Sequence, residues 1–277
     1  MIRILHVSDL HFGWPAVPEQ VEALETLIAR ERYDVVAVTG DIAQRARAGE
    51  LLRGAAFLRD AAKVSRTMIV PGNHDAAWWF APLGLGARSA IFAKYRRYIS
   101  PTLEPTLHLS GATFVGLNSA HGVTWGTLTW NPRDIGIVGD VRPRQLVRAA
   151  EQFHRAPAGD ARVVVMHHNP LPGQLSRRSG LSRPKPVLAA LAAMRVDLLL
   201  CGHDHQESVA SVERASHGMV ISTAGTVSSR SRGGRPGSIN SITLTDSAIE
   251  VDVLTWSSSA SAFDQAGGMR RCFARSN

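Results

Sequence analysis

Up to about residue 205, the chain alternates short apolar runs with longer amphipathic segments. The apolar runs are rich in Val, Ile and Leu, and their length suits strands that are buried on both faces. These runs cover residues 3–7, 34–38, 67–70, 112–117, 162–166 and 197–200. In the segments between them, apolar residues recur every three or four positions, as in a helix that buries one face. These segments cover residues 19–31, 50–63, 142–153 and 186–194. The alternation predicts strand–helix–strand units.

The pattern changes after residue 206. Apolar and polar residues then alternate one by one, with turn residues between the segments, which predicts antiparallel strands. We therefore predict an α/β fold with two mixed β-sheets flanked by helices. No linker divides the chain, so we expect a single domain over residues 1–256. Residues 257–277 are rich in Ser, Ala, Gly and Arg, and we predict a mobile C-terminal tail there.

Composition narrows the class of protein. The 277 residues, of which 44% are hydrophobic, are enough to bury a sizeable core. The two cysteines, Cys201 and Cys272, do not suggest a disulfide framework. The N-terminus has no small-residue cleavage site, and no window reaches the roughly 20 apolar residues of a membrane span. These features predict a cytoplasmic protein without a transmembrane segment.

The formal net charge is +8, and 28 of the 31 basic residues are arginines. A genome rich in Arg codons accounts for such an excess without any function. Attraction to an anionic substrate, a nucleic acid or a membrane surface is the functional alternative. The charge therefore leaves the partner open, and nothing in the sequence defines an oligomer interface.

Metal-ligand residue types follow five of the predicted strands, at the point where each strand ends. They are Asp9 and His11, then Asp41, then Asn73, His74 and Asp75, then His167 and His168, and finally His203, Asp204 and His205. In α/β sheets, ligands bind beyond the carboxyl ends of the strands. Such a collection of carboxylates and imidazoles would be unstable without a cation, because the carboxylates repel and the buried imidazoles lose their hydration.

The residue types also limit the metal. Imidazole and carboxylate together suit Mn, Fe, Zn, Co or Ni, whereas Ca and Mg prefer oxygen ligands alone. Seven or more ligands exceed the need of one ion, so two ions that share a carboxylate fit the count. The sequence therefore predicts a dinuclear metal site.

The five clusters closely resemble the motifs of the calcineurin-like metallophosphoesterases. That family has D-x-H, G-D, G-N-H-[D/E], H and G-H-x-H in this order. Here the motifs begin at Asp9, Gly40, Gly72, His167 and Gly202. The resemblance implies a four-layer α/β/β/α sandwich and a metal-dependent phosphoric ester hydrolase that contains two divalent or mixed-valence ions, with Mn, Fe or Zn as the candidates.

The resemblance also implies a role for each matching residue. The first ion would be held by Asp9, His11, Asp41 and His205. The second would be held by Asp41, Asn73, His167 and His203, with Asp41 as the bridge. His74 matches a family histidine that does not bind metal and sits over the substrate phosphate, so His74 is the candidate catalytic acid. Asp75 either orients His74, and then belongs to the catalytic residues, or closes the turn. Apart from the resemblance, His168 would line the site or orient a neighbour, and His121 lies in a loop that either faces the substrate or packs in the ordinary way. These two are the candidates for substrate binding.

Two departures narrow the subfamily. Serine/threonine phosphatases carry G-D-x-x-D-R-G, and purple acid phosphatases carry Tyr three residues after the second-motif Asp. Here Gln44 stands at the position of both the second Asp of the serine/threonine phosphatases and the Tyr of the purple acid phosphatases, and Ala46 replaces the final Gly. Both subfamilies are therefore disfavoured. The stretches SDLHF, LNSA and GDVRPRQL look most like bacterial class III cyclic-nucleotide phosphodiesterases. The resemblance thus implies hydrolysis of a phosphodiester by a hydroxide that bridges the metals, with a phosphate-ester small molecule, for instance a cyclic nucleotide, as the substrate.

Three alternatives stay open. A nuclease-like phosphodiesterase on DNA or RNA is supported by the net charge alone. A pyrophosphatase on a nucleotide-linked lipid would use Trp78 and Trp79 and the Arg-rich loops 176–185 and 228–236. A metal-binding scaffold without catalysis is disfavoured by the complete ligand set and by His74.

Overall fold

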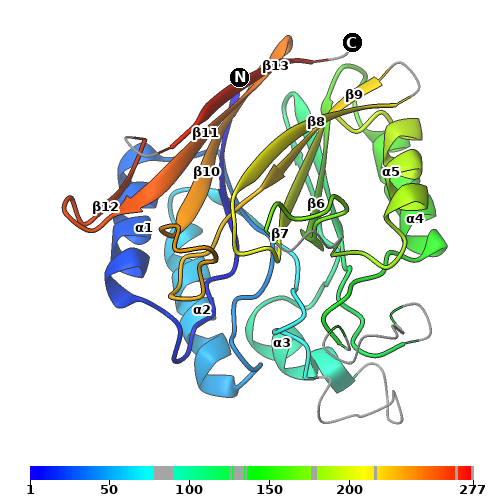
Figure 1. Cartoon of the computed structure of the whole chain (residues 1–277). Coiled ribbons are helices and arrows are strands. Elements are labelled where there is room, and N and C mark those ends of the chain that lie inside the picture. The colour runs from blue at the N-terminus through cyan, green and yellow to red at the C-terminus, as the bar shows by residue number, and fades with distance from the viewer. Residues whose placement is uncertain are drawn as a thin grey trace.

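Two β-sheets packed face to face form the centre of the protein in the computed structural model (Figure 1). The structure describes residues 1–77, 90–124, 127, 134, 136–175, 180–214, 217–265 and 268–275. In strand order, the first sheet contains β12 (Ala262–Asp264), β11 (Ala248–Ser257), β10 (Ser238–Leu244), β1 (Ile2–Val7), β2 (Val35–Val38) and β3 (Arg66–Ile69), and β13 (Arg270–Ala274) also pairs with β11. The second sheet contains β4 (Thr106–Leu109), β5 (Ala112–Leu117), β6 (Ala161–His168), β7 (Leu198–Gly202), β9 (His217–Thr223) and β8 (Ser208–Arg214).

Helices cover the outer face of each sheet. Helices α1 (Pro18–Glu31) and α2 (Ala48–Ala61) pack on the first sheet, and α4 (Pro143–Arg155) and α5 (Pro184–Ala193) pack on the second (Figure 1). A short 3₁₀ turn, η3 (Ala90–Phe92), leads into α3 (Ala93–Tyr98). None of the described helices combines the length and the hydropathy that a membrane span requires.

The alternation of side chains along each strand creates the layers. In β2, Val35 and Ala37 point into the core between the two sheets, while Val36 and Val38 contact the side chains of α1 and α2. The central strands of the second sheet behave in the same way toward α4 and α5. Because both faces of these strands are buried, their sequences are apolar throughout, and each fully buried aliphatic side chain contributes about 1.5–3 kcal/mol.

The predicted fold class is confirmed: two mixed sheets lie between helical layers. All six predicted strands of the first part of the chain and all four predicted helices are present, with ends that shift by a few residues. The strand β4 and the helix α3 were not predicted. Both are short, and β4 is an edge strand with alternating exposed and half-buried residues, so its sequence carries a weak signal.

The segment 257–277 corrects the sequence-based expectation of a tail. Ala262–Asp264 and Arg270–Ala274 form β12 and β13, and both strands pair antiparallel with β11. Most of β13 is exposed, which explains why its composition resembles that of a tail. The partner strand supplies the hydrogen bonds that keep this segment in the sheet.

Parallel pairing brings the ends of β1, β2 and β3 together at one edge. The ladder continues past the strands, since the amide of Asp9 donates to the carbonyl of Gly40 (3.1 Å) and the amide of His11 donates to the carbonyl of Asp41 (2.9 Å). Gly40 has a φ of +94°, and a Cβ at this position would lie 2.5 Å from the amide nitrogen of Gly72. Only glycine allows the ends of β2 and β3 to approach so closely.

Candidate metal centre

The polar residues that follow the strands of both sheets meet at one edge of the sandwich. His167 lies at the end of β6 and His203 follows β7, so the second sheet contributes its imidazoles to the same place as the first sheet. Two hydrogen bonds join the sheets there. The amide of His203 donates to Oδ2 of Asp9 (3.0 Å), and Nδ1 of His167 donates to the carbonyl of Thr39 (2.7 Å).

Four of the candidate ligands form a first group, which contains Asp9, His11, Asp41 and His205. Nε2 of His205 lies 3.0 Å from Oδ1 of Asp9 and 3.0 Å from Nε2 of His11. Nε2 of His11 lies 3.5 Å from Oδ1 of Asp9 and 3.9 Å from Oδ2 of Asp41. Four donor atoms from β1, β2 and the loop after β7 therefore face one small volume.

A second group lies directly beside the first. Nε2 of His167 lies 3.1 Å from Oδ1 of Asn73, 3.3 Å from Nδ1 of His203 and 3.4 Å from Oδ2 of Asp41. Nδ1 of His203 is also 3.1 Å from Oδ1 of Asn73. Oδ2 of Asp41 faces both groups, while its other oxygen accepts a hydrogen bond from the amide of His74 (2.8 Å). Asp41 therefore lies between the two groups and contacts both.

Several of these ligand atoms lack hydrogen-bond partners among the described residues, and a pair of metal ions would satisfy them. Nδ1 of His205 donates to the carbonyl of Arg230 (3.0 Å), so Nδ1 carries the proton of the neutral ring. Nε2 of His205 then carries a lone pair, which points at the neighbouring ring of His11. Oδ1 of Asp9 and Nδ1 of His11 are buried and have no hydrogen-bond partner within the described structure. Buried polar atoms that lack a partner are costly, and a cation among these atoms removes much of that cost.

The protonation states point to the same conclusion. Burial lowers the pKa of His11 to about 4 and that of His203 to about 3, so both rings offer lone pairs at neutral pH. Burial also lowers the pKa of His167, but the carboxylate of Asp41 outweighs burial and raises the pKa to about 9. Burial raises the pKa of Asp41, yet the imidazoles of His167 and His74 hold it well below its usual range. The carboxylates therefore draw positive charge into this volume, which two divalent ions would supply.

The backbone at the site is strained. Five candidate ligands have a positive φ although none of them is glycine: Asp9 (55°), His11 (45°), Asp41 (52°), His203 (72°) and His205 (53°). Non-glycine residues rarely adopt this conformation, and each instance costs on the order of 1–3 kcal/mol. Strain of this kind concentrates at functional sites, and here it turns the side chains toward a common point.

The geometry favours His167 over His168 as a ligand. With Nδ1 of His167 donating to Thr39, its Nε2 points at Asp41 and Asn73. In His168, by contrast, Nδ1 lies 2.7 Å from the hydroxyl of Ser119 and Nε2 donates to the carbonyl of Ile137 (2.8 Å). Both ring nitrogens are thus engaged, and the ring packs against His203 with a centroid separation of 4.6 Å. His168 is buried, and its contacts favour a role in positioning His203 over the expected contact with substrate.

His74 lies at the rim of the two groups. Its Nδ1 donates to the carbonyl of Gln44 (2.7 Å), which fixes the tautomer because a carbonyl only accepts. Its Nε2 then accepts a hydrogen bond from the guanidinium of Arg230 (3.2 Å). Arg230 also donates to the side-chain oxygen of Gln44 (3.1 Å). Both ring nitrogens therefore have partners outside the two groups, as expected for a histidine that does not bind metal.

The contacts of Asp75 favour the second alternative from the sequence, in which it closes the turn, over the orientation of His74. Its carboxylate accepts hydrogen bonds from the amides of Ala43 (2.8 Å), Gly72 (2.9 Å) and Ile42 (3.3 Å). No hydrogen bond to His74 occurs within the described structure. Burial, together with the nearby Asp41, raises the pKa of Asp75 to about 7. Asp75 ties the loop after β2 to the loop after β3, and so it holds two candidate ligands in place.

Other sequence-based candidates lie elsewhere. Nε2 of His121 donates to Oε1 of Gln145 (3.2 Å), and this ring lines a separate pocket beside α4. Burial and the nearby Arg142 lower the pKa of His121 to about 4, so the ring is neutral at pH 7. Trp78, Trp79 and residues 176–179 lie outside the described residues.

Two residues at the rim carried no motif in the sequence. The loop 228–236 is rich in arginine, but its sequence does not distinguish Arg230 from Arg232 and Arg235. Trp14 lies three residues after His11, and its side chain is 94% exposed. Ala16 pairs with Ser228, and the amide of Ser229 donates to the carbonyl of Pro15 (2.8 Å), so the loops of Trp14 and Arg230 are joined. Only this tertiary pairing brings the loop that carries Trp14 next to the loop that carries Arg230.

Comparison with known proteins agrees with this arrangement. The family model described as "Calcineurin-like phosphoesterase" matches residues 2–207. No curated protein sequence matches the chain.

Solved structures share the fold at low sequence identity. A purple acid phosphatase from yellow lupin (Lupinus luteus) seeds has a TM-score of 0.67 and 11% identity, and the alignment covers 99% of this chain and 54% of the lupin chain. The chain thus spans about half of the length of that phosphatase. GAP50, the anchor in the inner membrane complex of Plasmodium, has a TM-score of 0.54 and 16% identity over 92% of this chain and 84% of its own. The protein TT1561 of Thermus thermophilus has a TM-score of 0.51 and 15% identity over 86% of this chain and 93% of its own.

We predict that Asp41→Asn removes at least one of two bound metal ions per chain. Asn can still accept the hydrogen bond from the amide of His74, so the loop should survive, but the charge that faces both groups is lost. Metal content after dialysis, measured by inductively coupled plasma mass spectrometry, checks this. Asp34→Asn is the matched control, because Asp34 is exposed at the opposite end of β2 and should keep the wild-type content. A variant Asp41→Asn that retains two ions would contradict the bridging position.

Proposed function

The chain belongs to the calcineurin-like phosphoesterase family, and we propose that it is a metal-dependent phosphodiesterase. The observation that carries the proposal is the convergence of seven candidate ligands from both sheets on one edge, with His74 and Arg230 at the rim. We propose Asp9, His11, Asp41 and His205 for one ion. Asp41, Asn73, His167 and His203 would hold the other. Such ions would neutralise the charge of a phosphate and lower the pKa of bound water to about 7.

In this proposal Arg230 binds the substrate phosphate. In the structure its guanidinium rests on Nε2 of His74 and on Oε1 of Gln44, which are two neutral acceptors. An anionic phosphate oxygen is a better acceptor, because it adds the attraction between opposite charges to the hydrogen bond and can bind the guanidinium through two parallel bonds. The arrival of substrate would therefore draw Arg230 away from His74.

The release of Arg230 leaves Nε2 of His74 free to act on the leaving group. Nδ1 stays bound to the carbonyl of Gln44, so the ring keeps its orientation. Nε2 has no proton while it accepts from Arg230; once released, it would take up a proton from solvent, and the imidazolium would pass this proton to the departing oxygen. A histidine in this position stabilises the alkoxide that forms when the phosphorus–oxygen bond breaks. In this proposal, one hydrogen bond couples His74, the candidate acid, to Arg230, the candidate phosphate-binding residue.

The rim also supports a substrate that carries a nucleoside. Trp14 presents an exposed aromatic face on a loop that is joined to the loop of Arg230. Single exposed aromatic residues are common, but one beside a phosphate site provides a surface on which a base can stack. Cyclic nucleotides and other nucleotidyl phosphodiesters have both groups, and we propose this class as the substrate.

A substrate panel tests the proposal. Protein loaded with Mn is assayed on bis-p-nitrophenyl phosphate, p-nitrophenyl phosphate, cyclic AMP, single-stranded DNA and a lipid-linked nucleotide diphosphate. We expect phosphodiester hydrolysis at a kcat/KM at least about tenfold above that of the monoester, with Asp41→Asn as the inactive control. Lack of turnover on every compound, with two metals bound, would refute the enzymatic role.

We predict that His74→Ala keeps both metal ions and loses about 10²- to 10⁴-fold in kcat, which is the usual contribution of general acid catalysis. The loss should shrink for substrates with good leaving groups, such as nitrophenol, because these depart without a proton. Steady-state kinetics together with metal analysis check both points. His154→Ala, an exposed histidine on α4, is the control and should behave as the wild type. A missing ion in His74→Ala would make His74 a ligand instead of an acid.

We predict that Arg230→Gln raises KM by about tenfold or more while kcat changes less, because a charge-assisted contact to the phosphate is lost. Arg235→Gln is the matched control in the same loop. Arg235 pairs with Glu207 (2.9 Å) at the surface, where an ion pair contributes little. Equal KM values in the two variants would exclude Arg230 from phosphate binding.

A further inference from the structure

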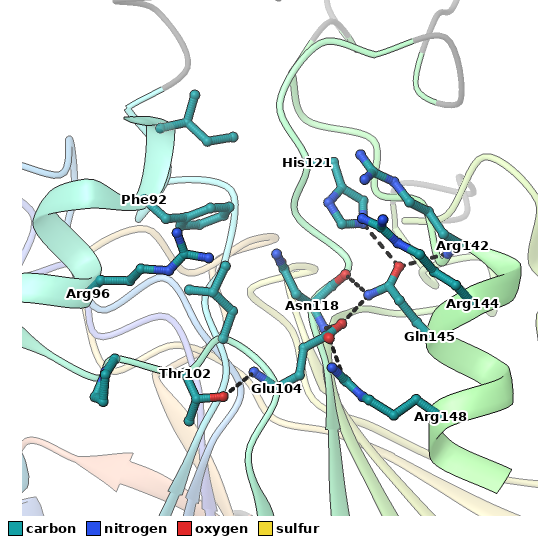
Figure 2. A pocket seen from close by; sticks show the side chains of 13 residues that line it. Phe92, Arg96, Thr102, Glu104, Asn118, His121, Arg142, Arg144, Gln145 and Arg148 are labelled. Atoms are coloured by element: carbon teal, nitrogen blue, oxygen red, sulfur yellow. Dashed lines mark hydrogen bonds and ion pairs between the residues drawn. The ribbon is translucent and has the colours of Figure 1, made fainter. Parts of the chain in front are cut away.

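A second cavity, separate from the metal centre, lies between α3 and the start of α4. Its volume is about 600 Å³, which is within the usual range for a small-molecule site. Figure 2 shows two walls that face each other. One wall comes from Phe92, Arg96 and the segment 101–104, and the other comes from His121 and from the first turns of α4.

The floor of this cavity is a closed network of hydrogen bonds. The side-chain nitrogen of Gln145 donates to the carbonyl of Asn118 (2.8 Å) and to Glu104, and Oε1 of Gln145 accepts from the amide of Arg142 (2.8 Å) and from His121 (3.2 Å). Glu104 also accepts from the amide of Asn118 (3.2 Å) and pairs with Arg148. Because these groups satisfy each other, the floor is held rigid without help from the remaining arginines (Figure 2).

The cavity carries a strong excess of positive charge. Four arginines line it, which are Arg96, Arg142, Arg144 and Arg148, and Glu104 is the single carboxylate among its lining residues. The excess is therefore three positive charges. Arg96 and Arg144 have no acidic partner within the described structure, and both side chains are exposed. Like charges on facing walls repel each other, so the arginines do not stabilise the fold by facing each other. An anion between the walls would be attracted by both.

The shape and charge together indicate the chemistry of the ligand. Guanidinium groups match the oxygens of phosphate through paired hydrogen bonds, and arginine is the residue that proteins use most for such recognition. The side chains of Phe92 and Leu103 provide apolar surface next to this charge. The volume exceeds that of a single phosphate, so a phosphate attached to an organic group fits it better.

A short chain of contacts links the cavity to the metal centre, although none of the candidate metal ligands lines the cavity. Asn118 lines the cavity, and the next residue, Ser119, lies 2.7 Å from Nδ1 of His168, which packs on His203. We propose that this cavity, with Arg96 and Arg144 on its opposite walls, binds a phosphate group other than the one that is hydrolysed. Such a group belongs either to the same substrate molecule or to a separate phosphate-bearing ligand.

A titration with inorganic phosphate, followed by calorimetry at fixed ionic strength, tests this proposal on the metal-loaded full chain. The wild type should show two kinds of sites. Arg96→Gln/Arg144→Gln should raise the Kd of one site by at least about tenfold, because each lost contact to an anion is worth a factor of ten or more, and should leave the other site intact. Asp41→Asn should weaken phosphate binding at the metal centre and leave the cavity site intact.

The control for charge is Arg97→Gln/Arg155→Gln. It removes one arginine from each of the same two helices, but neither residue lines the cavity. Phosphate binding should be that of the wild type. The proposal is overturned if Arg96→Gln/Arg144→Gln binds phosphate as the wild type does, or if the control pair weakens binding equally. A protein that keeps the cavity site but hydrolyses no phosphate ester would refute the proposed function and leave this inference standing.

Two dinucleotides distinguish the sources of the phosphate. This arm rests on the proposed function and compares adenylyl-adenosine with and without a 5′-phosphate. If the cavity receives a second phosphate of the substrate, the 5′-phosphate should lower KM at least about tenfold in the wild type and not in Arg96→Gln/Arg144→Gln. If the cavity receives a separate ligand, the two dinucleotides should have equal KM values in both proteins while the titration still loses its cavity site. Either result supports a phosphate site in the cavity.

Discussion

Carboxylates and imidazoles crowd together at the edge that the two sheets share, and this crowding is the constraint on which the rest of the structure depends. Oδ2 of Asp41 faces two rings, and the nitrogens of His11 and His205 point at each other across 3.0 Å. No such arrangement is stable in isolation. The ladder between the first two strands, the close approach of Gly40 and Gly72, and the backbone bonds to Asp75 all hold the side chains in it. The strain at five positive-φ residues is a cost that the packed sheets offset.

The sheets and the rim divide the work of the site. The parallel strands are buried on both faces, so the residues at their ends are held on a rigid base, and the family match covers this part of the chain. The residues that would meet a substrate lie instead on loops, where Trp14 and Arg230 are joined through Ala16 and Ser228. A fold of this kind hosts many activities, and the loops decide among them. The arginine-lined cavity beside α4 is a second feature outside the sheets and adds charge that the metal centre does not explain.

One hydrogen bond connects the two candidate steps of catalysis. Because Nδ1 of His74 donates to a carbonyl, the other ring nitrogen, Nε2, is the acceptor to which Arg230 donates. Binding of an anion by Arg230 and release of His74 would then be the same event. In the proposed function, this hydrogen bond would couple the release of His74 to the binding of a phosphate.

The sequence by itself determined the fold class and the set of residues that meet at the sheet edge, because strand periodicity is local and parallel strands end together. Strand periodicity alone leaves His167 and His168 open, since both end one strand, and the choice of His167 rests on the alignment with the family motif. Only the hydrogen bonds to Thr39, Ser119 and Ile137 show which ring nitrogen is left to face the centre. Nor could strand periodicity place β13 in a sheet, because an exposed edge strand draws its stability from its partner strand.

Contacts between distant segments decided the remaining features. The sequence leaves open whether Asp75 orients His74 or closes the turn. Two of its partners are the amides of Ile42 and Ala43, more than 30 residues away, and partners at that distance leave no local pattern. Arg230 and Trp14 are more than 200 residues apart, and the cavity combines residues of α3, the segment after β5 and α4. Local sequence specifies which side chains are available, whereas the packing of the two sheets and their loops specifies which of them share one environment.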